Sequence, residues 1–333
     1  MRIGLIGAGR IGSVHAANLA TLLEVSDTVV TDLDEVRAKE LADAHGLTTA
    51  PSVDALLDAD LDGLVIAAPT SEHAVLLARA AAVGVPVFCE KPLASDVAGT
   101  KAVIATLAAA GVPLQVGFQR RFDPGYAAAR AAALSGELGW LHTIWACTYD
   151  AAPPHADYIP TSGGIFRDCN VHDFDVVRWV TGREVVSVFS QGGNRGASFF
   201  AAAGDVDTAS SLLTLDDGTQ AFVGATRYNG AGYDVRMEVH GSLGTVSAGL
   251  DDATPVRSVE AGVSWPAGTG YPHFTQRFVT AYRAELAAFC EVAAGRAPSP
   301  CPGADALAAL LIAEAAQLSK DEGRVVAMSE VGV

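Results

Sequence analysis

Hydrophobic and polar residues follow one rhythm from residue 1 to about residue 119. Short apolar runs, such as RIGLIG at 2–7 and GLVIAAP at 63–69, alternate with longer stretches of helical periodicity, such as residues 71–84. Buried strands that alternate with helices are typical of a parallel sheet covered by helices on both faces. The pattern therefore predicts a doubly wound α/β domain over residues 1–119.

A different rhythm begins after residue 120. Helical segments surround residues 163–175, and strand-like runs then follow one another at 184–191, 207–215, 219–227, 234–241 and 244–249. The sequence LDDGT at 215–219 is a hairpin signal between two of these runs. Strands joined by tight turns predict a mostly antiparallel sheet with one open face, in an α+β domain over residues 120–300. Helical periodicity returns from residue 274 onward.

Composition excludes several classes of partner. Only 18% of the residues are charged, and no apolar run is long enough for a membrane helix. The net charge is −16, with no basic cluster beyond Arg120–Arg121, which argues against nucleic acid as a partner. The chain begins directly with an apolar strand, so we expect no secretory signal and a cytoplasmic location. Five scattered cysteines without a CxxC pair predict reduced thiols rather than disulfides or a zinc site.

A glycine-rich turn follows the first predicted strand. Gly7, Gly9 and Gly12 permit a tight turn, close approach of a diphosphate to the backbone, and close packing of helix on strand. Asp32 follows about 20 residues after the last glycine, where a carboxylate can bind the hydroxyls of an adenosine ribose. This combination predicts a Rossmann dinucleotide-binding domain. Asp32 would repel a 2′-phosphate and Leu33 supplies no cation, so the pattern favours NAD over NADP.

Glu90 and Lys91 stand at the C-terminal end of another apolar run. Ligands of open parallel sheets bind beyond such strand ends. The Lys91 ammonium can therefore reach the crevice that would hold a nicotinamide ring.

The segment GGIFRDCNVHDFD at 163–175 carries the third signal. Asp168, His172 and Asp175 are spaced i, i+4 and i+7, which places them on one face if the segment is a helix. From the residues alone, three readings are open: a metal site, a general base with an orienting acid, or a solvated helix face. No fourth metal ligand is evident, and we expect no metal.

Several motifs occur together in one order: GAGRIG at 7–12, PTSEHA at 69–74, EKPLA at 90–94, GFQRRFDP at 117–124 and SGGIFRDCNVHDFD at 162–175. In this the chain resembles the glucose–fructose oxidoreductase / inositol dehydrogenase / rhizopine catabolism family, and most of all its inositol 2-dehydrogenase branch. The resemblance extends over nearly the whole chain. It implies a nucleotide-binding domain, then a domain with a large open sheet that pairs into dimers or tetramers, and a last helical segment, 301–333, that packs back on the first domain.

The resemblance also assigns roles to residues. The family's catalytic lysine, histidine and aspartate match Lys91, His172 and Asp168. An imidazole can accept the proton of a secondary alcohol while a hydride leaves carbon for NAD. Lys91 can polarise the same oxygen, Asp168 can orient the ring, and the roles of Lys91 and His172 can also be exchanged. Asp175 is expected to be structural.

The remaining expected contacts fall into two groups. The residues expected to line the cofactor are Gly7, Gly9, Arg10, Ile11, Gly12, Asp32, Pro69, Thr70, His73, Glu90 and Lys91. Those expected to contact the substrate are Lys91, Arg121, His155, Asp168, His172 and Tyr233. For Arg121, a structural salt bridge is an equal alternative.

The expected reaction is NAD-dependent oxidation of a hydroxyl of a cyclic polyol, such as myo-inositol, to the ketone. One departure from the branch affects the substrate: Tyr149-Asp150-Ala151 stands where related sequences carry an Arg-Asp-Pro pattern. This loses a cation and leaves a sugar or an aminocyclitol open as substrate. A lyase or glycosidase with transiently reduced NAD, and a cofactor-sensing binding protein, are the alternatives of other classes.

Overall fold

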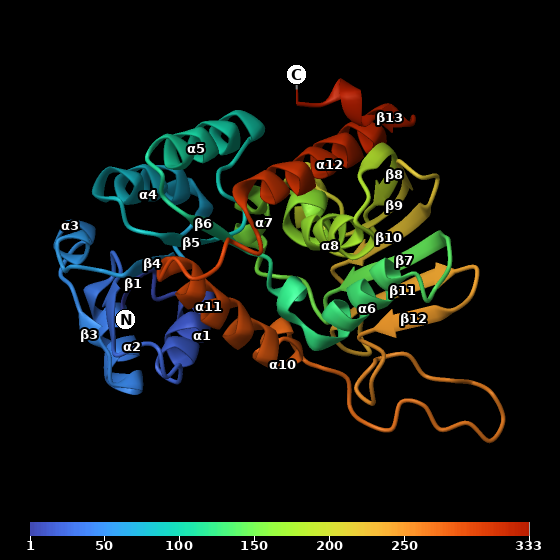
Figure 1. The fold of residues 1–333 in the computed structure, drawn as a ribbon. Coiled ribbons are helices and arrows are strands. Elements are labelled where there is room, and N and C mark those ends of the chain that lie inside the picture. The colour runs from blue at the N-terminus through green and yellow to red at the C-terminus, as the bar shows by residue number, and fades with distance from the viewer. Residues whose placement is uncertain (333) are drawn as a thin grey trace. The chain divides into compact units, whose positions relative to one another are not determined.

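The structure, a computed structural model, describes residues 1–332 (Figure 1). The chain divides into two compact units. The first comprises Met1–Phe122 and Val279–Leu307, and the second comprises Asp123–Phe278 and Ala308–Val333. Each unit is built around one β-sheet.

The first unit contains a six-stranded sheet in the order β3-β2-β1-β4-β5-β6, and every neighbouring pair is parallel. Its strands are β1 (Arg2–Ile6), β2 (Asp27–Thr31), β3 (Thr48–Thr49), β4 (Gly63–Ile66), β5 (Val87–Glu90) and β6 (Leu114–Gly117). The predicted doubly wound sheet is confirmed. The strand order reverses between β1 and β4, and the crevice beyond the carboxyl ends at such a reversal is the usual ligand site.

Helices cover both faces of this sheet (Figure 1). They are α1 (Arg10–Leu19), α2 (Glu35–His45), α3 (Val53–Leu57), α4 (Thr70–Val83), α5 (Val97–Ala109) and, from the C-terminal part of the chain, α11 (Val279–Ala293). Because both faces are covered, the central strands are continuous apolar runs: all four residues of β4 are buried, and so are the last four of β1.

The two long helices of the C-terminal region fall into different units. We expected residues 301–333 to pack on the first domain, which stays a prediction, and α11 is grouped with the first unit. Its residues Leu286, Phe289 and Cys290 are fully buried in one apolar cluster with β1 and β5. The later helix α12 (Gly303–Glu322) is grouped with the second unit from Ala308 onward. Both helices have an apolar face, so the periodicity alone could not decide which core each one joins.

The second unit contains a seven-stranded sheet in the order β12-β11-β7-β10-β9-β8-β13. The strands are β7 (Leu141–Tyr149), β8 (Val185–Gly193), β9 (Thr208–Leu215), β10 (Gln220–Thr226), β11 (Asp234–Gly241), β12 (Thr245–Ala248) and β13 (Val326–Ala327). The sheet is mostly antiparallel, as predicted, and β7 pairs in parallel with β10. The sequence pattern did not identify β7, although this strand links the two halves of the sheet.

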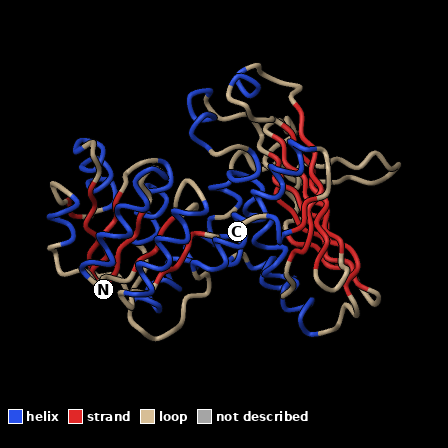
Figure 2. The backbone as a smooth tube through the Cα atoms, turned by 90° about the horizontal axis from the view of Figure 1, so that it is seen from above, coloured by secondary structure: helices blue, strands red, loops and turns tan. Residues whose placement is uncertain are grey.

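The helices of the second unit lie on one face of its sheet (Figure 2). They are α6 (Pro124–Ser135), α7 (Ile159–Ser162), α8 (Val171–Thr181), α9 (Phe199–Ala202), α10 (Phe274–Arg277) and α12, together with a π-helical turn, Phe166–Asn170. Short 3-10 helices occur at Gln119–Phe122, Ala156–Tyr158 and Met328–Glu330.

An apolar row crosses the other face of this sheet. Trp145, Phe222, Leu212 and Phe189 are neighbours in register on β7, β10, β9 and β8. None of the four is fully buried, and Phe222 is 46% exposed. Side chains opposite one another across strands form a continuous surface, so this row is a partly exposed apolar stripe.

All five cysteines are buried free thiols, in agreement with the predicted reduced state. Among residues 1–332, no helix is both long and apolar enough to cross a membrane.

Candidate active site

Glycine shapes the turn after β1. Gly7 has a φ of 104°, a conformation that residues with a side chain rarely adopt. A Cβ at Gly12 would stand 1.9 Å from the Gly7 carbonyl oxygen, so α1 packs against the turn only because residue 12 has no side chain. A Cβ at Gly9, in contrast, would meet nothing within 4 Å. The backbone at Gly9 is therefore open to a diphosphate.

The N-terminus of α1 begins at this turn. Gly9 is the N-cap of the helix and no side chain caps it. The first N–H groups of a helix have no intrahelical acceptor, and the helix dipole favours an anion there. The turn thus fits the diphosphate of a dinucleotide, while the contacts expected from Arg10 and Ile11 stay predictions.

Asp32 is fixed at the end of β2 by backbone donors. The Ala8 N–H donates to Asp32 Oδ2 at 2.6 Å, and the Asp34 N–H donates to Oδ1 at 2.9 Å. The carboxylate is therefore held next to the glycine turn, as its predicted ribose contact requires. Arg37 Nη1 lies 3.9 Å from Asp32 Oδ1.

The loops after β4 and β5 are tied together by a histidine. Pro69 is the N-cap of α4, which begins at Thr70. His73 is buried, and its ring nitrogens lie 2.8 Å from the Ala68 carbonyl oxygen and 2.7 Å from the Pro92 carbonyl oxygen. His73 thus ties the two loops together, and the contacts of Pro69, Thr70 and His73 with the cofactor stay predictions.

Glu90 is directed into the first unit. Its Oε1 lies 2.7 Å from Nε2 of the fully buried His15, a histidine that belongs to none of the sequence motifs. The Glu90 side chain is thus engaged by His15, and its expected contact with the cofactor stays a prediction. Lys91, the next residue, is partly exposed.

The segment 163–175 contains two kinds of helix. Asp168 lies in the π-helical turn Phe166–Asn170, and His172 lies in the first turn of α8. The prediction of a single helical face was therefore wrong in detail, because the wider π turn precedes the α-helix. Such turns occur often at functional sites. Asp175 is fully buried, which agrees with a structural role.

Asp168 is held by a buried arginine. Arg227 is 3% exposed, and its guanidinium donates to Asp168 Oδ2 at 2.7 Å and to Asp150 Oδ2 at 2.9 Å. Burial opposes the guanidinium charge, but Cys169, Asp168 and Asp150 outweigh it and raise the pKa of Arg227. Burial raises the pKa of Asp150, and the Arg227 charge opposes that rise.

Tyr158 holds the other oxygen of Asp168. Its hydroxyl donates to Asp168 Oδ1 at 2.8 Å. Desolvation and then the Asp168 charge raise the pKa of Tyr158, so the phenol keeps its proton at neutral pH. No sequence motif indicated the roles of Tyr158 and Arg227. The signal was weak: Arg227 is a single cation at the end of a strand run, and a buried arginine requires an anionic partner.

Three residues predicted to contact the substrate make contacts with other residues of the protein. Arg121 Nη1 donates to Asp305 Oδ2 at 2.8 Å and to the Pro300 carbonyl oxygen at 3.0 Å, within the first unit, which favours the structural alternative. His155 is exposed and lies 3.3 Å from Asp157. Tyr233 is buried at the start of the β11 region, and its N–H donates to the Tyr271 carbonyl oxygen at 2.6 Å.

Lys91 belongs to the first unit, whereas Asp168 and His172 belong to the second. The meeting of the three side chains in one site stays a prediction.

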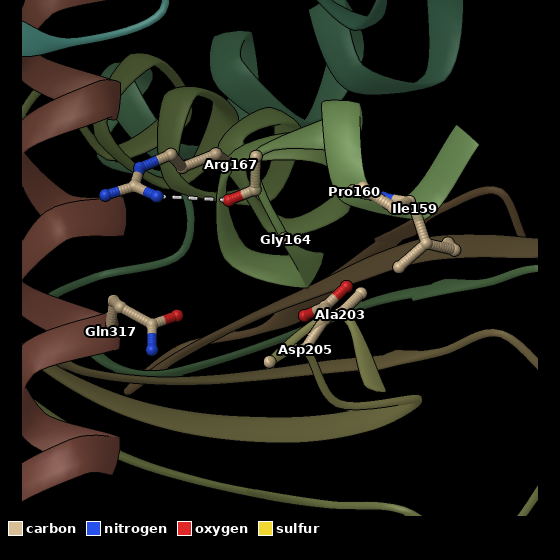
Figure 3. A pocket seen from close by; sticks show the side chains of 9 residues that line it. Ile159, Pro160, Gly164, Arg167, Ala203, Asp205 and Gln317 are labelled. Atoms are coloured by element: carbon tan, nitrogen blue, oxygen red, sulfur yellow. Dashed lines mark hydrogen bonds between the residues drawn. The ribbon is translucent and has the colours of Figure 1, made fainter. Parts of the chain in front are cut away.

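A separate cavity of about 320 Å³ lies in the second unit (Figure 3). Its polar lining includes Arg167, Asp205 and Gln317, with Gly163 and Gly164 forming part of the wall. Arg167 is engaged by Glu314 through two contacts of 2.5 Å. Asp168 is not among the residues that line this cavity.

Two family models match the chain. Residues 1–118 match the model described as an oxidoreductase family with an NAD-binding Rossmann fold. Residues 126–247 match the GFO/IDH/MocA C-terminal domain. The predicted cofactor, NAD, agrees with the first match and with the glycine turn and Asp32.

Relatives extend along the whole chain. The inositol 2-dehydrogenase of Rhizobium meliloti (strain 1021) is 37% identical over 335 residues, 99% of each chain. A crystal structure of a myo-inositol dehydrogenase from Corynebacterium glutamicum is 36% identical, with a TM-score of 0.90 over 98% of each chain. A scyllo-inositol dehydrogenase from Lactobacillus casei, solved with NAD(H) and scyllo-inositol, is 27% identical, with a TM-score of 0.86 over 99% of each chain.

We expect Asp32→Ala to weaken the preference for NAD over NADP. A hydrogen bond to a charged group contributes about 1.5–3 kcal/mol, so the selectivity should fall about 10- to 100-fold. Steady-state kinetics with both cofactors measures this ratio. Asp32→Asn is the matched control for the loop, because its amide oxygen can still accept from Ala8. An unchanged ratio in both variants would remove Asp32 from the ribose site.

We expect Arg227→Met to lower the free energy of unfolding by about 3–5 kcal/mol at neutral pH, because two partly buried carboxylates lose their buried partner. Without the Arg227 charge, which opposes the effect of burial, the folded-state pKa of Asp150 should rise further above its unfolded value. The loss should therefore be absent at acidic pH and grow as pH rises above the ordinary pKa of aspartate. Urea unfolding at several pH values measures it.

Two variants accompany this measurement. Arg257→Met, which changes an exposed arginine, should leave stability within experimental error. Adding Asp150→Asn to Arg227→Met should restore part of the loss. A pH-independent loss would show that the charge pairs are not its cause.

Proposed function

This chain belongs to the Gfo/Idh/MocA family of NAD-binding oxidoreductases, and we propose that it oxidises a secondary hydroxyl of a cyclic polyol, myo-inositol or a related inositol, to the ketone. The observation that carries the proposal is full-length similarity to inositol dehydrogenases across both domains. The glycine turn and Asp32 support NAD as the hydride acceptor.

The chain's own residues handle the hydroxyl proton. Bound NAD supplies the acceptor for the hydride that leaves carbon. In the proposal, His172 accepts the hydroxyl proton, and the Lys91 ammonium stabilises the negative charge that develops on the same oxygen. Asp168 stabilises the imidazolium. Its own charge is maintained by Arg227, and its orientation by Arg227 and Tyr158.

The structure also bears on the departure at Tyr149-Asp150-Ala151. Asp150 keeps a cationic partner there, because Arg227 reaches it from the end of β10. The loop has thus lost one possible cation without leaving its carboxylate uncompensated. A site rich in fixed donors and acceptors favours a hydroxyl-bearing ring, since unpaired buried polar groups penalise ligands that lack hydroxyls.

We further propose that the chain forms homo-oligomers, dimers or tetramers, through the open face of the seven-stranded sheet. The stripe of Trp145, Phe222, Leu212 and Phe189 supports this, because contiguous exposed apolar surface is typical of interfaces. Five buried free cysteines support a cytoplasmic location, where thiols stay reduced.

We expect the purified chain to reduce NAD in the presence of myo-inositol or scyllo-inositol, measured as NADH absorbance across a panel of inositols and hexoses. Lys91→Ala and His172→Ala should each lower turnover by about 10²- to 10⁴-fold and leave the dissociation constant for NAD near that of the unmodified chain. The proposal fails if no polyol supports NADH formation. The roles assigned to Lys91 and His172 fail if either variant keeps full turnover.

We expect Phe222→Asp to shift the chain toward the monomer, because a buried interface cannot accommodate an unpaired carboxylate without a large penalty. Light scattering after size exclusion measures the mass. Leu23→Asp is the control, since it places the same charge on an exposed leucine of the first unit. An unchanged oligomer in Phe222→Asp would place the interface elsewhere.

A further inference from the structure

A buried group of three titratable side chains lies under the strand end that carries Lys91. His15 comes from α1, Glu90 from β5 and Glu285 from α11, and their potential ligand atoms all lie within 4.8 Å of one another. His15 and Glu285 are fully buried. The proposed reaction gives none of the three a role.

Glu285 is the unexplained member of this group. Neither of its carboxyl oxygens has a hydrogen-bond partner among the described residues. Its backbone carbonyl accepts from Gln115 Nε2 at 2.8 Å, so the helix is fixed at this point. The neighbouring residues Leu286 and Phe289 belong to the apolar core. An ionised carboxylate in such surroundings would carry a large desolvation penalty.

Glu90 is already occupied as an acceptor. Its Oε1 lies 2.7 Å from His15 Nε2. Its Oε2 lies over Gly117 on β6, where a Cβ would stand 2.9 Å away, so no larger residue fits there without displacing the carboxyl group. Three elements, α1, β6 and α11, thus surround one carboxyl group at the end of β5.

Two carboxyl groups this close do not both ionise in a buried site. Burial, and then the charge of Glu90, raise the pKa of Glu285 well above its ordinary value. A neutral carboxylic acid has one O–H to donate, and a carboxylate has lone pairs to accept it. A protonated oxygen of Glu285 can therefore donate a hydrogen bond to the second oxygen of Glu90.

We propose that Glu285 is a positioning residue for Lys91: as a neutral acid it shares its proton with Glu90 and, together with His15, holds that carboxylate inside the domain. Glu90 is the last residue of β5, and Lys91 follows it directly. Anchoring the Glu90 side chain therefore fixes the backbone from which the Lys91 side chain departs. The inference rests on the proposed function for the role of Lys91, but not for the shared proton.

A metal ion is the competing occupant, because one histidine and two carboxylates form a common ligand set. The 2.7 Å contact between His15 Nε2 and Glu90 Oε1 argues against it, since a tetrahedral ion with ligand bonds of about 2.0–2.1 Å separates its ligand atoms by about 3.3 Å. A ligating histidine also usually donates its other ring N–H to an acceptor. His15 Nδ1 is buried and has no such partner within residues 1–332.

The charged and titratable groups on the elements around Glu285 are Arg10 and His15 on α1, Cys89 and Glu90 on β5, Tyr282, Arg283, Cys290 and Glu291 on α11, and Arg120 and Arg121 on the 3-10 helix packed against α11. Glu90 is the charge that acts on Glu285. Because the folded-state pKa of Glu285 is raised, its contribution to stability is complete at acidic pH. It is lost as pH rises above the ordinary pKa of glutamate.

The experiment compares two variants of the full chain. Glu285→Gln keeps the shape and a permanent donor, whereas Glu285→Leu keeps the approximate volume without a donor. The unmodified chain should show the infrared band of a protonated carboxyl group at neutral pH, and both variants should lack it. Glu285→Gln should be more stable than the unmodified chain at pH 8, with the difference disappearing toward pH 4.

Positioning is measured by hydrogen exchange of residues 87–92 and by turnover. In Glu285→Leu, protection of this segment should fall tenfold or more, and turnover should fall up to about 10²-fold, as misplacement of a catalytic group can cause. The KM for the polyol should change little. Glu285→Gln should restore both protection and turnover.

The outcomes separate this inference from the proposed function. Absence of the carboxyl band, equal exchange in both variants, or a stoichiometric divalent metal lost in Glu285→Gln would each overturn the inference, whatever the activity. If no polyol is oxidised but the band and the loss of protection in Glu285→Leu are found, the shared proton and its effect on the strand end stand, and the proposed function fails.

Discussion

Arg227 places a nearly fully buried guanidinium between Asp150 and Asp168, within hydrogen-bond distance of both. Without that cation, the π-helical turn would carry a carboxylate in a poorly solvated place, where the neutral form is favoured. A neutral Asp168 could not stabilise an imidazolium on His172. The negative charge that the proposed chemistry requires is therefore maintained by a residue that has no direct part in it.

The first unit also contains acidic groups in poorly solvated surroundings, but their charge is reduced in a different way. Glu285 and Glu90 lie close together in an apolar core, with His15 as the partner of Glu90. Here a retained proton, rather than a guanidinium, reduces the charge of the pair. In each unit, the charge of an acid is reduced near a residue predicted to act on substrate. Arg227 does this for Asp168 itself in the second unit. A retained proton does this for Glu285 and Glu90, next to Lys91, in the first unit.

Sequence patterns predicted the parts of the fold in which neighbours along the chain are neighbours in space. The alternation of strands and helices led to the parallel sheet, and LDDGT led to the β9–β10 hairpin, whose Leu215 N–H donates to the Thr219 carbonyl oxygen. The strand β7 was missed because its pairing partners β10 and β11 lie far along the chain. The position of α11 was missed because an apolar helical face does not specify which core it enters.

The sequence by itself determined the cofactor turn and the family, because glycine spacing and motif order are local properties of the chain. Gly7 and Gly12 can be interpreted without knowing any distant contact, since a positive φ and close helix packing exclude side chains there. Only the tertiary structure decided which groups lie next to each acidic side chain and reduce its charge. Arg227 is 59 residues from Asp168 in sequence, and Glu285 comes from a helix remote from β5. The energy of a buried charge depends on whichever groups folding brings within a few ångströms of it, and those groups leave no periodic signal in the sequence.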